Sequence, residues 1–343
     1  MFVDRYRFAK HPSVIAEAAA PRMLALFQHP RSRALAALTQ FRGRAEIRDA
    51  LGAFADDESR AVFRDVMRYR AHGAAFSELA QDRDRYEALE AWMTRELPSQ
   101  ALSQRIESGT GETLRLWRVE HDGKTLELTA SKYGLYWAFA TDQYHFLRGT
   151  VRIAPEPGDV VVDAGAYLGE TAARFALDVG PEGKVLAFDP SAFHARLAQE
   201  NAERNGLADR VQVFAAGLAG VSNIDNAAAA EPTDDAVRET ADEGRRMRDS
   251  DRQLALDDLC RWQGLGKVDF IKMDVEGSEI PALEGAHETI LAHRPKLGIS
   301  VYHRPTDLWA IPNLIRRKYP FYRLYLDHHS LYGEETVLYA QAM

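Results

Sequence analysis

The first hundred residues place large apolar side chains at a helical period. These side chains recur every three or four residues, as Val62, Val66 and Tyr69 and then as Tyr86, Leu89, Trp92, Met93 and Leu97. Such spacing puts apolar groups on one face of an α-helix, and Pro98 ends the last run. The pattern predicts an N-terminal helical region over residues 1–105.

At residue 113 the period changes to two. Over the segment TLRLWRVEHDGKTLELTAS, apolar and polar residues alternate on both sides of Asp122-Gly123. Alternation is typical of half-buried strands, and Asp-Gly between two alternating runs favours a tight turn. We therefore expect a β-hairpin that opens a second domain, residues 113–343.

Between residues 158 and 302, short apolar runs alternate with helix-like segments. The runs cover residues 160–163, 185–189, 211–215, 268–274 and 297–302, and the helix-like segments cover residues 170–178, 191–205 and 279–292. This order predicts a doubly wound α/β fold, with a mostly parallel sheet and helices on both faces. Residues 221–255 interrupt the order with nine acids and five arginines, which predicts a surface excursion.

Composition adds limits on the class of protein. Of the 343 residues, 46% are hydrophobic, which allows a sizeable core. No run approaches the ~18 to 20 apolar residues that cross a bilayer, and the N-terminus lacks a signal-peptide pattern. We expect a cytoplasmic protein with no transmembrane segment. The single cysteine, Cys260, is interpreted as a small core residue.

The charge is unevenly distributed. The net charge of −8 argues against a nucleic-acid partner, because such binding rests on clustered Lys and Arg. Residues 1–52, however, hold nine Lys and Arg against four acids. This segment is interpreted as a solvated helical face, with a docking surface for an acidic partner or an anionic lipid headgroup as the alternative. We expect the helical region to supply a homo-oligomer interface or a lid.

Residues 160–176, VVVDAGAYLGETAARFA, predict a ligand-binding loop. A buried strand ends at Asp163, and a loop with Gly165 and Gly169 leads into a helix. Glycine allows a tight turn and a close approach of the backbone to a ligand, and the start of a helix offers free N–H groups. The segment is therefore predicted to cradle a nucleotide-like cofactor.

The acids decide which cofactor fits. The spacing Asp-x-Gly-x-x-x-Gly differs from the G-x-G-x-x-G of dinucleotide sites, and a carboxylate at the strand end repels a pyrophosphate. S-adenosylmethionine has an ammonium, a sulfonium and a ribose but no phosphate. Asp189 ends the next strand and is placed to accept both ribose hydroxyls, although helix capping is the alternative role for either acid. The predicted cofactor residues are Asp163, Gly165, Ala166, Tyr167, Gly169, Asp189 and Pro190.

A second charged segment follows the fourth strand. VDFIKMDVEGSEIPALEGA, residues 268–286, delivers Lys272, Asp274 and Glu276 in alternation, which predicts that all three share one face. In open α/β sheets ligands bind at the carboxyl ends of the strands, so Asp274 and Glu276 are candidates for the active site. The alternative is a pair between Lys272 and a carboxylate, with Glu276 capping the next helix.

Histidines follow the later strands. SVYHRP places Tyr302 and His303 at the end of the fifth strand, whereas His328 and His329 are predicted in a polar turn. The predicted catalytic residues are Asp274, His303 and Glu276. Asp274 or His303 could act as the base for an acceptor hydroxyl, and the same three side chains could bind a divalent cation.

In order and spacing, these segments resemble the FkbM-type methyltransferases. The resemblance rests on DAGAYLGETAARFA, AFDP, LALDDLC, VDFIKMDVEGSEIPALEGA, RPKLGISVYHRPTDLWAIP and ETVLYA, within residues 113–343. It implies a class I methyltransferase (Rossmann-like) sheet of seven strands with the last one antiparallel. It also implies S-adenosylmethionine as cofactor and O-methylation of a sugar, glycan or glycosylated metabolite. Family loops commonly have Asn where this chain has Tyr167.

Two other functions stay open from the sequence. One is an NAD-dependent oxidoreductase on a similar sheet, which the missing third glycine disfavours. The other is a scaffold without catalysis that binds a partner through the helical region, which the joint presence of Asp163, Asp189 and Asp274 disfavours. A cofactor-binding titration distinguishes the methyltransferase from the oxidoreductase.

Overall fold

The computed structural model describes residues 30–72, 79, 91–92, 95, 97–102, 106–107, 113–232, 252–330 and 334–343. The predictions that concern residues 1–29, Tyr86, Leu89, Met93 and residues 233–251 of the excursion lie outside the described residues. The chain forms two compact units. We call Arg95–Ile299 the central unit, and Met1–Thr94 with Ser300–Met343 the terminal unit.

A seven-stranded sheet has the strand order β13-β14-β12-β11-β6-β7-β8. Its strands are β6 (Val160–Ala164), β7 (Lys184–Phe188), β8 (Val211–Phe214), β11 (Phe270–Met273), β12 (Lys296–Ser300), β13 (Tyr322–His328) and β14 (Thr336–Ala342). The first five pair parallel with one another, and β13 and β14 pair antiparallel. The predicted class I sheet, mostly parallel with an antiparallel last strand, is confirmed.

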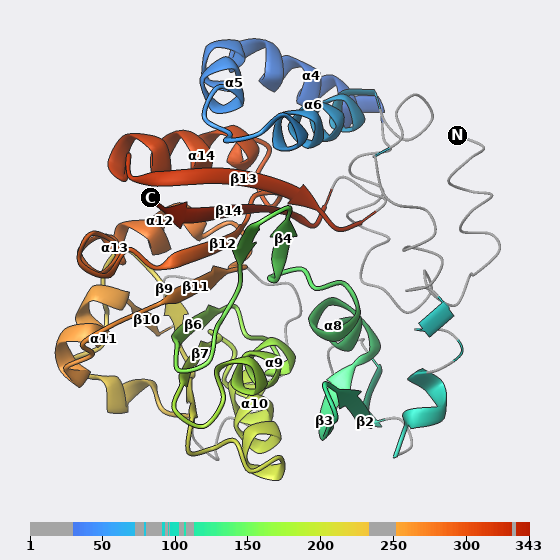
Figure 1. Cartoon of the computed structure of the whole chain (residues 1–343), viewed down its shortest axis with the longest axis vertical. Coiled ribbons are helices and arrows are strands. Elements are labelled where there is room, and N and C mark those ends of the chain that lie inside the picture. Colours follow the sequence, from blue (N-terminus) through green and yellow to red (C-terminus); the bar gives the residue numbers. More distant parts are fainter. Residues whose placement is uncertain are drawn as a thin grey trace. The chain divides into compact units, whose positions relative to one another are not determined.

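Helices follow the parallel strands of the central unit, as the alternation predicts (Figure 1). They are α9 (Glu170–Val179), α10 (Ala192–Arg204), α11 (Leu256–Gln263), α12 (Glu279–Glu284) and α13 (His287–His293). Helices α9 and α10 pack against each other and against the strands β6, β7 and β8. The β-branched and aromatic residues of these strands are buried, among them Val161, Val162, Phe188 and Ile271, so the core lies on the sheet.

The predicted helix over 279–292 is two helices, and the reason is local packing. A Cβ on Gly285 would lie 2.0 Å from the carbonyl oxygen of Ala219, so the chain passes too close for a side chain. The carbonyl of Gly285 accepts from Asp257 N at 2.8 Å. The Asp257 carboxylate then accepts from the backbone amides of Glu288 and Thr289, at 2.9 and 2.8 Å, and so caps the start of α13.

The predicted hairpin is present and belongs to the central unit. Strands β2 (Thr113–His121) and β3 (Lys124–Ser131) pair antiparallel around the turn at Asp122 and Gly123. Asparagine side chains of α10 bind the free edge of β3. Asn201 accepts from Thr129 N and donates to Thr129 O, both at 2.8 Å, and Asn205 does the same with Glu127 at 2.7 and 2.9 Å. An edge that would otherwise be free to pair with another strand is thus covered.

Shorter elements complete the central unit. They are η2 (Leu97–Gln100), β1 (Ile106–Glu107), α8 (Lys132–Leu135), η3 (Tyr136–Ala140), β4 (Phe146–Arg148), β5 (Val151–Ile153), β9 (Gly217–Leu218), η4 (Ala227–Ala230) and β10 (Gln253–Leu254). β9 and β10 form a parallel pair of two residues each, at the two ends of the predicted excursion. Across the described residues, no helix is long and apolar enough to span a bilayer.

The terminal unit joins helices from the start of the chain to the last two strands (Figure 1). Its helices are α4 (Pro30–Arg42), α5 (Arg44–Leu51), α6 (Asp57–His72) and α14 (Asp307–Lys318). The prediction of a polar turn at His328 is wrong. This residue ends β13, is buried, and its Nδ1 lies 2.8 Å from Thr336 Oγ1 on β14.

Residues 54–59 cover the free edge of β13. Ala55 N donates to Leu324 O at 2.8 Å, and Leu326 N donates to the fully buried Ser59 Oγ at 2.9 Å. On α14, Asn313 Nδ2 donates to Glu46 O at 2.7 Å. Residues 46–59 are therefore hydrogen-bonded to β13 and α14, which come near the other end of the sequence. Independent folding of residues 113–343 stays a prediction.

The buried Ser59 hydroxyl gives a stability test. Ser59→Ala leaves the Leu326 amide without its acceptor in a buried site, which should lower the free energy of unfolding by about 1–3 kcal/mol. Urea denaturation measures this. The control is Thr125→Ala, which removes an exposed hydroxyl bonded to Glu120 and should change stability by less than about 0.5 kcal/mol. Equal effects of the two substitutions would contradict the role of Ser59.

Candidate active site

The glycine loop joins the end of β6 to the start of α9 in a left-handed backbone conformation. Gly165, Tyr167 and Gly169 have φ angles of 78°, 50° and 87°. A Cβ on Gly165 would lie 1.8 Å from the Asp274 carbonyl oxygen, and one on Gly169 would lie 2.9 Å from the Cα of Ala198. Glycine is therefore required at both places by contact as well as by φ.

The loop is fastened to the end of the neighbouring strand. The amides of Gly165 and Ala166 both donate to the carbonyl oxygen of Phe188, the last residue of β7, at 2.9 Å. This brings the loop beside Asp189 and Pro190, which follow directly. All seven predicted cofactor residues thus belong to the ends of β6 and β7 and the loop between β6 and α9.

Asp163 lies beneath the loop rather than in it. Its carboxylate is fully buried, forms an ion pair with Lys272 Nζ at 2.9 Å and accepts from Thr171 Oγ1 at 2.6 Å. Lys272 is also buried and donates to the carbonyl oxygen of Gly165 at 2.5 Å. The ammonium offsets the charge of Asp163, which weakens the argument that this acid repels a pyrophosphate. Direct contact of Asp163 with a cofactor stays a prediction.

Asp189 holds the other side of the loop. Its Oδ2 accepts from Tyr167 N at 3.1 Å, and its Oδ1 accepts from Ser191 N at 2.9 Å. His194 Nδ1 lies 3.1 Å from the same Oδ1, and its ring meets the Tyr167 ring edge to face, with centroids 4.5 Å apart. Sequence analysis missed His194. Its place in the first turn of the helix after Asp189 is the signal that could have found it.

The second predicted segment, residues 268–286, contains β11 and then passes beside the loop. Lys272, Asp274 and Glu276 do not share one environment: Lys272 is buried, Asp274 is half-buried and Glu276 is exposed. Glu276 has a φ of 53°, so the backbone turns at that residue. Glu279, the first residue of α12, bonds the turn before the helix, since its Oε1 accepts from Val275 N at 3.1 Å and from Gly277 N at 3.3 Å.

Tyr144 contacts both Asp274 and Lys272, and sequence analysis did not predict it. Its hydroxyl donates to Asp274 Oδ2 at 3.0 Å, and the Lys272 ammonium lies 5.4 Å from the centre of its ring. Tyr144 is buried and its ring meets Phe175 of α9 edge to face. No local pattern marks this tyrosine, because Asp274 and Lys272 are more than a hundred residues away in the chain.

His303 belongs to the terminal unit. It follows β12 and is half-buried. The centroid of its ring lies 4.2 Å from the centroid of the buried Tyr302 ring. Asp274 and Glu276 belong to the central unit, so the convergence of His303 with them stays a prediction. In the part of the chain that the structure describes, no three His, Cys, Asp or Glu side chains are grouped to hold a metal ion.

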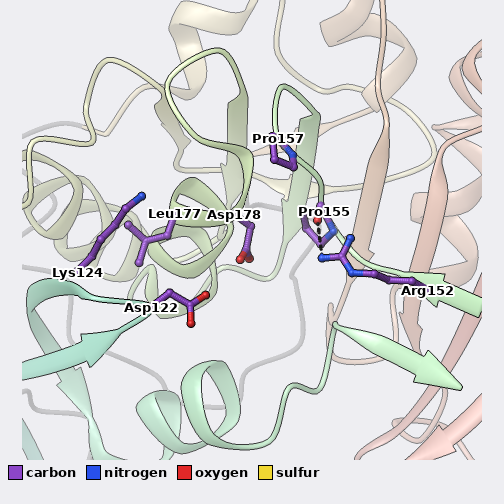
Figure 2. A pocket seen from close by; sticks show the side chains of 7 residues that line it. All are labelled: Asp122, Lys124, Arg152, Pro155, Pro157, Leu177 and Asp178. Atoms are coloured by element: carbon purple, nitrogen blue, oxygen red, sulfur yellow. Dashed lines mark hydrogen bonds between the residues drawn. The ribbon is translucent and has the colours of Figure 1, made fainter.

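A pocket of about 240 Å³ lies elsewhere in the central unit (Figure 2). Its lining consists of Asp122, Lys124, Arg152, Pro155, Pro157, Leu177 and Asp178. Pro155 and Pro157 precede β6, so the pocket lies at the amino end of this strand, away from the end where open α/β sheets bind ligands. Both charge signs line it, and it contains none of the predicted site residues. We do not assign the active site there.

Comparisons with known proteins bear on the family and on the fold. Residues 163–331 match the model of the methyltransferase FkbM domain. The 2-O-methyltransferase NoeI of Sinorhizobium fredii (strain NBRC 101917 / NGR234) is 28% identical over 162 residues, which are 43% of this chain and 65% of the relative. A crystal structure of methyltransferase FkbM from Methylobacillus flagellatus KT is similar with a TM-score of 0.54 and 21% identity, over 88% of this chain and 60% of that chain.

The chain thus spans less than two thirds of the length of either protein. The structural similarity supports the class I fold, and the family model covers the glycine loop, Asp189, the segment after β11 and His303. The predicted resemblance to the FkbM-type methyltransferases is thus confirmed over residues 163–331, which match the methyltransferase FkbM domain.

Proposed function

We propose that this protein transfers the methyl group of S-adenosylmethionine to a hydroxyl of a sugar, glycan or glycosylated metabolite. The observation that carries the proposal is the glycine loop with Asp189 bonded to its Tyr167 amide, within a matched FkbM domain. The printed activity of the relative NoeI, 2-O-methylation, supports oxygen as the methyl acceptor. A small molecule or glycan is the proposed partner, and nucleic acid is not.

The residues around the loop fit the proposed cofactor. Gly165 and Gly169 leave the backbone open where a Cβ would contact Asp274 O or Ala198. A carboxylate has about four lone-pair sites, and the bonds from Tyr167, Ser191 and His194 leave Asp189 able to accept a ribose hydroxyl. Asp189 and Asp274 supply negative charge beside the loop, which suits a cationic ligand. We propose the whole predicted set, from Asp163 to Pro190, as the cofactor site.

The proposed chemistry needs positioning and a base. S-adenosylmethionine supplies an electrophilic methyl group when it is bound, and the protein must align an acceptor oxygen and take its proton. Asp274 lies at the carboxyl end of β11 beside Gly165 and is held by the Tyr144 hydroxyl. We propose Asp274 or His303 as the base, and Tyr144 as the residue that orients Asp274. Glu276, exposed at the turn, is a candidate for contact with the acceptor.

Cofactor binding tests the proposal most directly. Calorimetry should give micromolar affinity for S-adenosylhomocysteine and no measurable binding of NAD. Asp189→Ala should weaken cofactor binding by about 1.5 to 3 kcal/mol, because charge-assisted bonds to the ribose are lost. The exposed Asp209→Ala is the matched control and should bind as the wild type does. Equal binding of both cofactors would contradict the function, and an unchanged affinity of Asp189→Ala would leave this residue a helix cap.

The buried ion pair beneath the loop gives a second test. Lys272→Met leaves a charged Asp163 buried and unpaired, so the free energy of unfolding should fall by about 3–5 kcal/mol. Pairing it with Asp163→Asn should recover part of that loss. Urea denaturation measures both, with the exposed Lys124→Met as the control. If Lys272→Met were as stable as wild type, the pair would not support the loop.

The proposed base is testable once an acceptor is found. In single-turnover assays, Asp274→Asn or His303→Ala should lower the rate by about 10² to 10⁴ if that residue takes the proton, with little change in affinity for S-adenosylhomocysteine. Tyr144→Phe should lower it less, by about five- to tenfold, since one hydrogen bond to Asp274 is lost. Wild-type rates in all three variants would remove these residues from the mechanism.

The same assay separates proton transfer by a side chain from metal assistance. A divalent cation on Asp274, Glu276 and His303 would lower the pKa of the acceptor hydroxyl. In that case a chelator abolishes turnover and Mg²⁺ or Mn²⁺ restores it. Turnover that is unchanged by the chelator would leave the side chains alone as the source of the base.

A further inference from the structure

Helix α4 carries its large apolar side chains on the outside of the terminal unit. Leu35, Leu38 and Phe41 are 60%, 45% and 66% exposed. Their spacing of three residues keeps them on one side of the helix. A helix at the surface of a globular protein normally turns such a stripe toward the core.

The inward side of α4 is small or polar instead. Ala36, Thr39 and Gln40 are the half-buried positions, and Gln40 Nε2 donates to Met67 O of α6 at 2.9 Å. Packing against α6 therefore uses little apolar area of α4. The apolar side of the helix is available for a ligand or a surface.

Exposed arginines follow this apolar stripe in the chain. Helices α4 and α5 contain five arginines and two acids, in a chain whose net charge is −8. Arg42, Arg44 and Arg48 are exposed, and the Arg44 guanidinium lies over the Phe41 ring at 5.0 Å. Apolar side chains with cations at their border match a surface that has acyl chains below anionic headgroups.

We propose that α4, with the arginines of α4 and α5, binds the surface of a membrane that contains anionic lipids. Leu35, Leu38 and Phe41 enter the boundary between headgroups and acyl chains, and Arg42, Arg44 and Arg48 contact the phosphates. Binding of this kind leaves the helix parallel to the membrane surface and does not require a spanning segment.

A second copy of the chain fits this face less well. A two-fold dimer buries the same patch of each copy, so one interface would collect the arginines of both copies against fewer acids. Like charges brought together at an interface are costly. Anionic headgroups, in contrast, neutralise the same arginines, which is why we favour the lipid surface.

Vesicle sedimentation of the full chain tests the proposal. Vesicles of phosphatidylcholine with one third phosphatidylglycerol should bind the protein, pure phosphatidylcholine vesicles should bind it at least about tenfold less, and added salt should weaken binding. The double variant Leu38→Ser/Phe41→Ser and the double variant Arg42→Glu/Arg44→Glu should each lose at least about tenfold in affinity.

Matched controls come from the central unit. Leu147→Ser changes a side chain that is 70% exposed, and Arg252→Glu reverses an exposed charge; both should bind vesicles as the wild type does. Failure to bind anionic vesicles overturns the proposal, and so does binding that the α4 variants leave unchanged. Dimerisation that Leu38→Ser/Phe41→Ser abolishes, without vesicle binding, assigns the face to a second copy instead. Cofactor affinity measured beside these assays reports separately on the proposed enzyme function.

Discussion

The buried pair of Lys272 and Asp163 is the contact on which the candidate site depends. The two residues are register partners on the neighbouring central strands β11 and β6. A slip of one residue would place each charge beside an apolar residue without its partner, so the pair specifies the register of the centre of the sheet. The Lys272 ammonium also donates to the Gly165 carbonyl oxygen. One side chain therefore contributes to both the strand register and the loop conformation.

Local patterns predicted much of the fold. The alternating periods gave the hairpin, the five parallel strands and most of their helices, because side-chain periodicity depends on residues that are close in sequence. The break between α12 and α13 was not predictable, since it depends on Ala219 and Asp257, distant in the chain. His328 was placed in a turn because its neighbours are polar, whereas its bond to Thr336 keeps it in β13.

For the site, the sequence indicated the right segments but not how the charges are distributed. The spacing of Gly165 and Gly169 predicted that both lie in a tight loop. In the structure, each lies so close to a neighbouring segment that a Cβ would clash. Asp163 supports the loop through its ion pair with Lys272, which comes more than a hundred residues later in the chain. Tyr144 was missed for the same reason, because it reaches Asp274 only through the fold. His194 is different, since it follows Asp189 closely in the chain and its place in the first turn of the next helix was a signal that sequence analysis did not use.

Helix α10 shows how contacts with the loop constrain the sequence. His194 reaches Asp189, Ala198 lies against Gly169, and Asn201 Nδ2 donates to Leu168 O as well as to β3. These three positions recur at intervals of four and three residues, so they lie on one face of the helix and all contact the loop or Asp189. A single inserted residue within α10 would rotate part of that face by about 100° and separate its contacts. The length of this helix is therefore under tighter constraint than the identity of its solvent-facing residues.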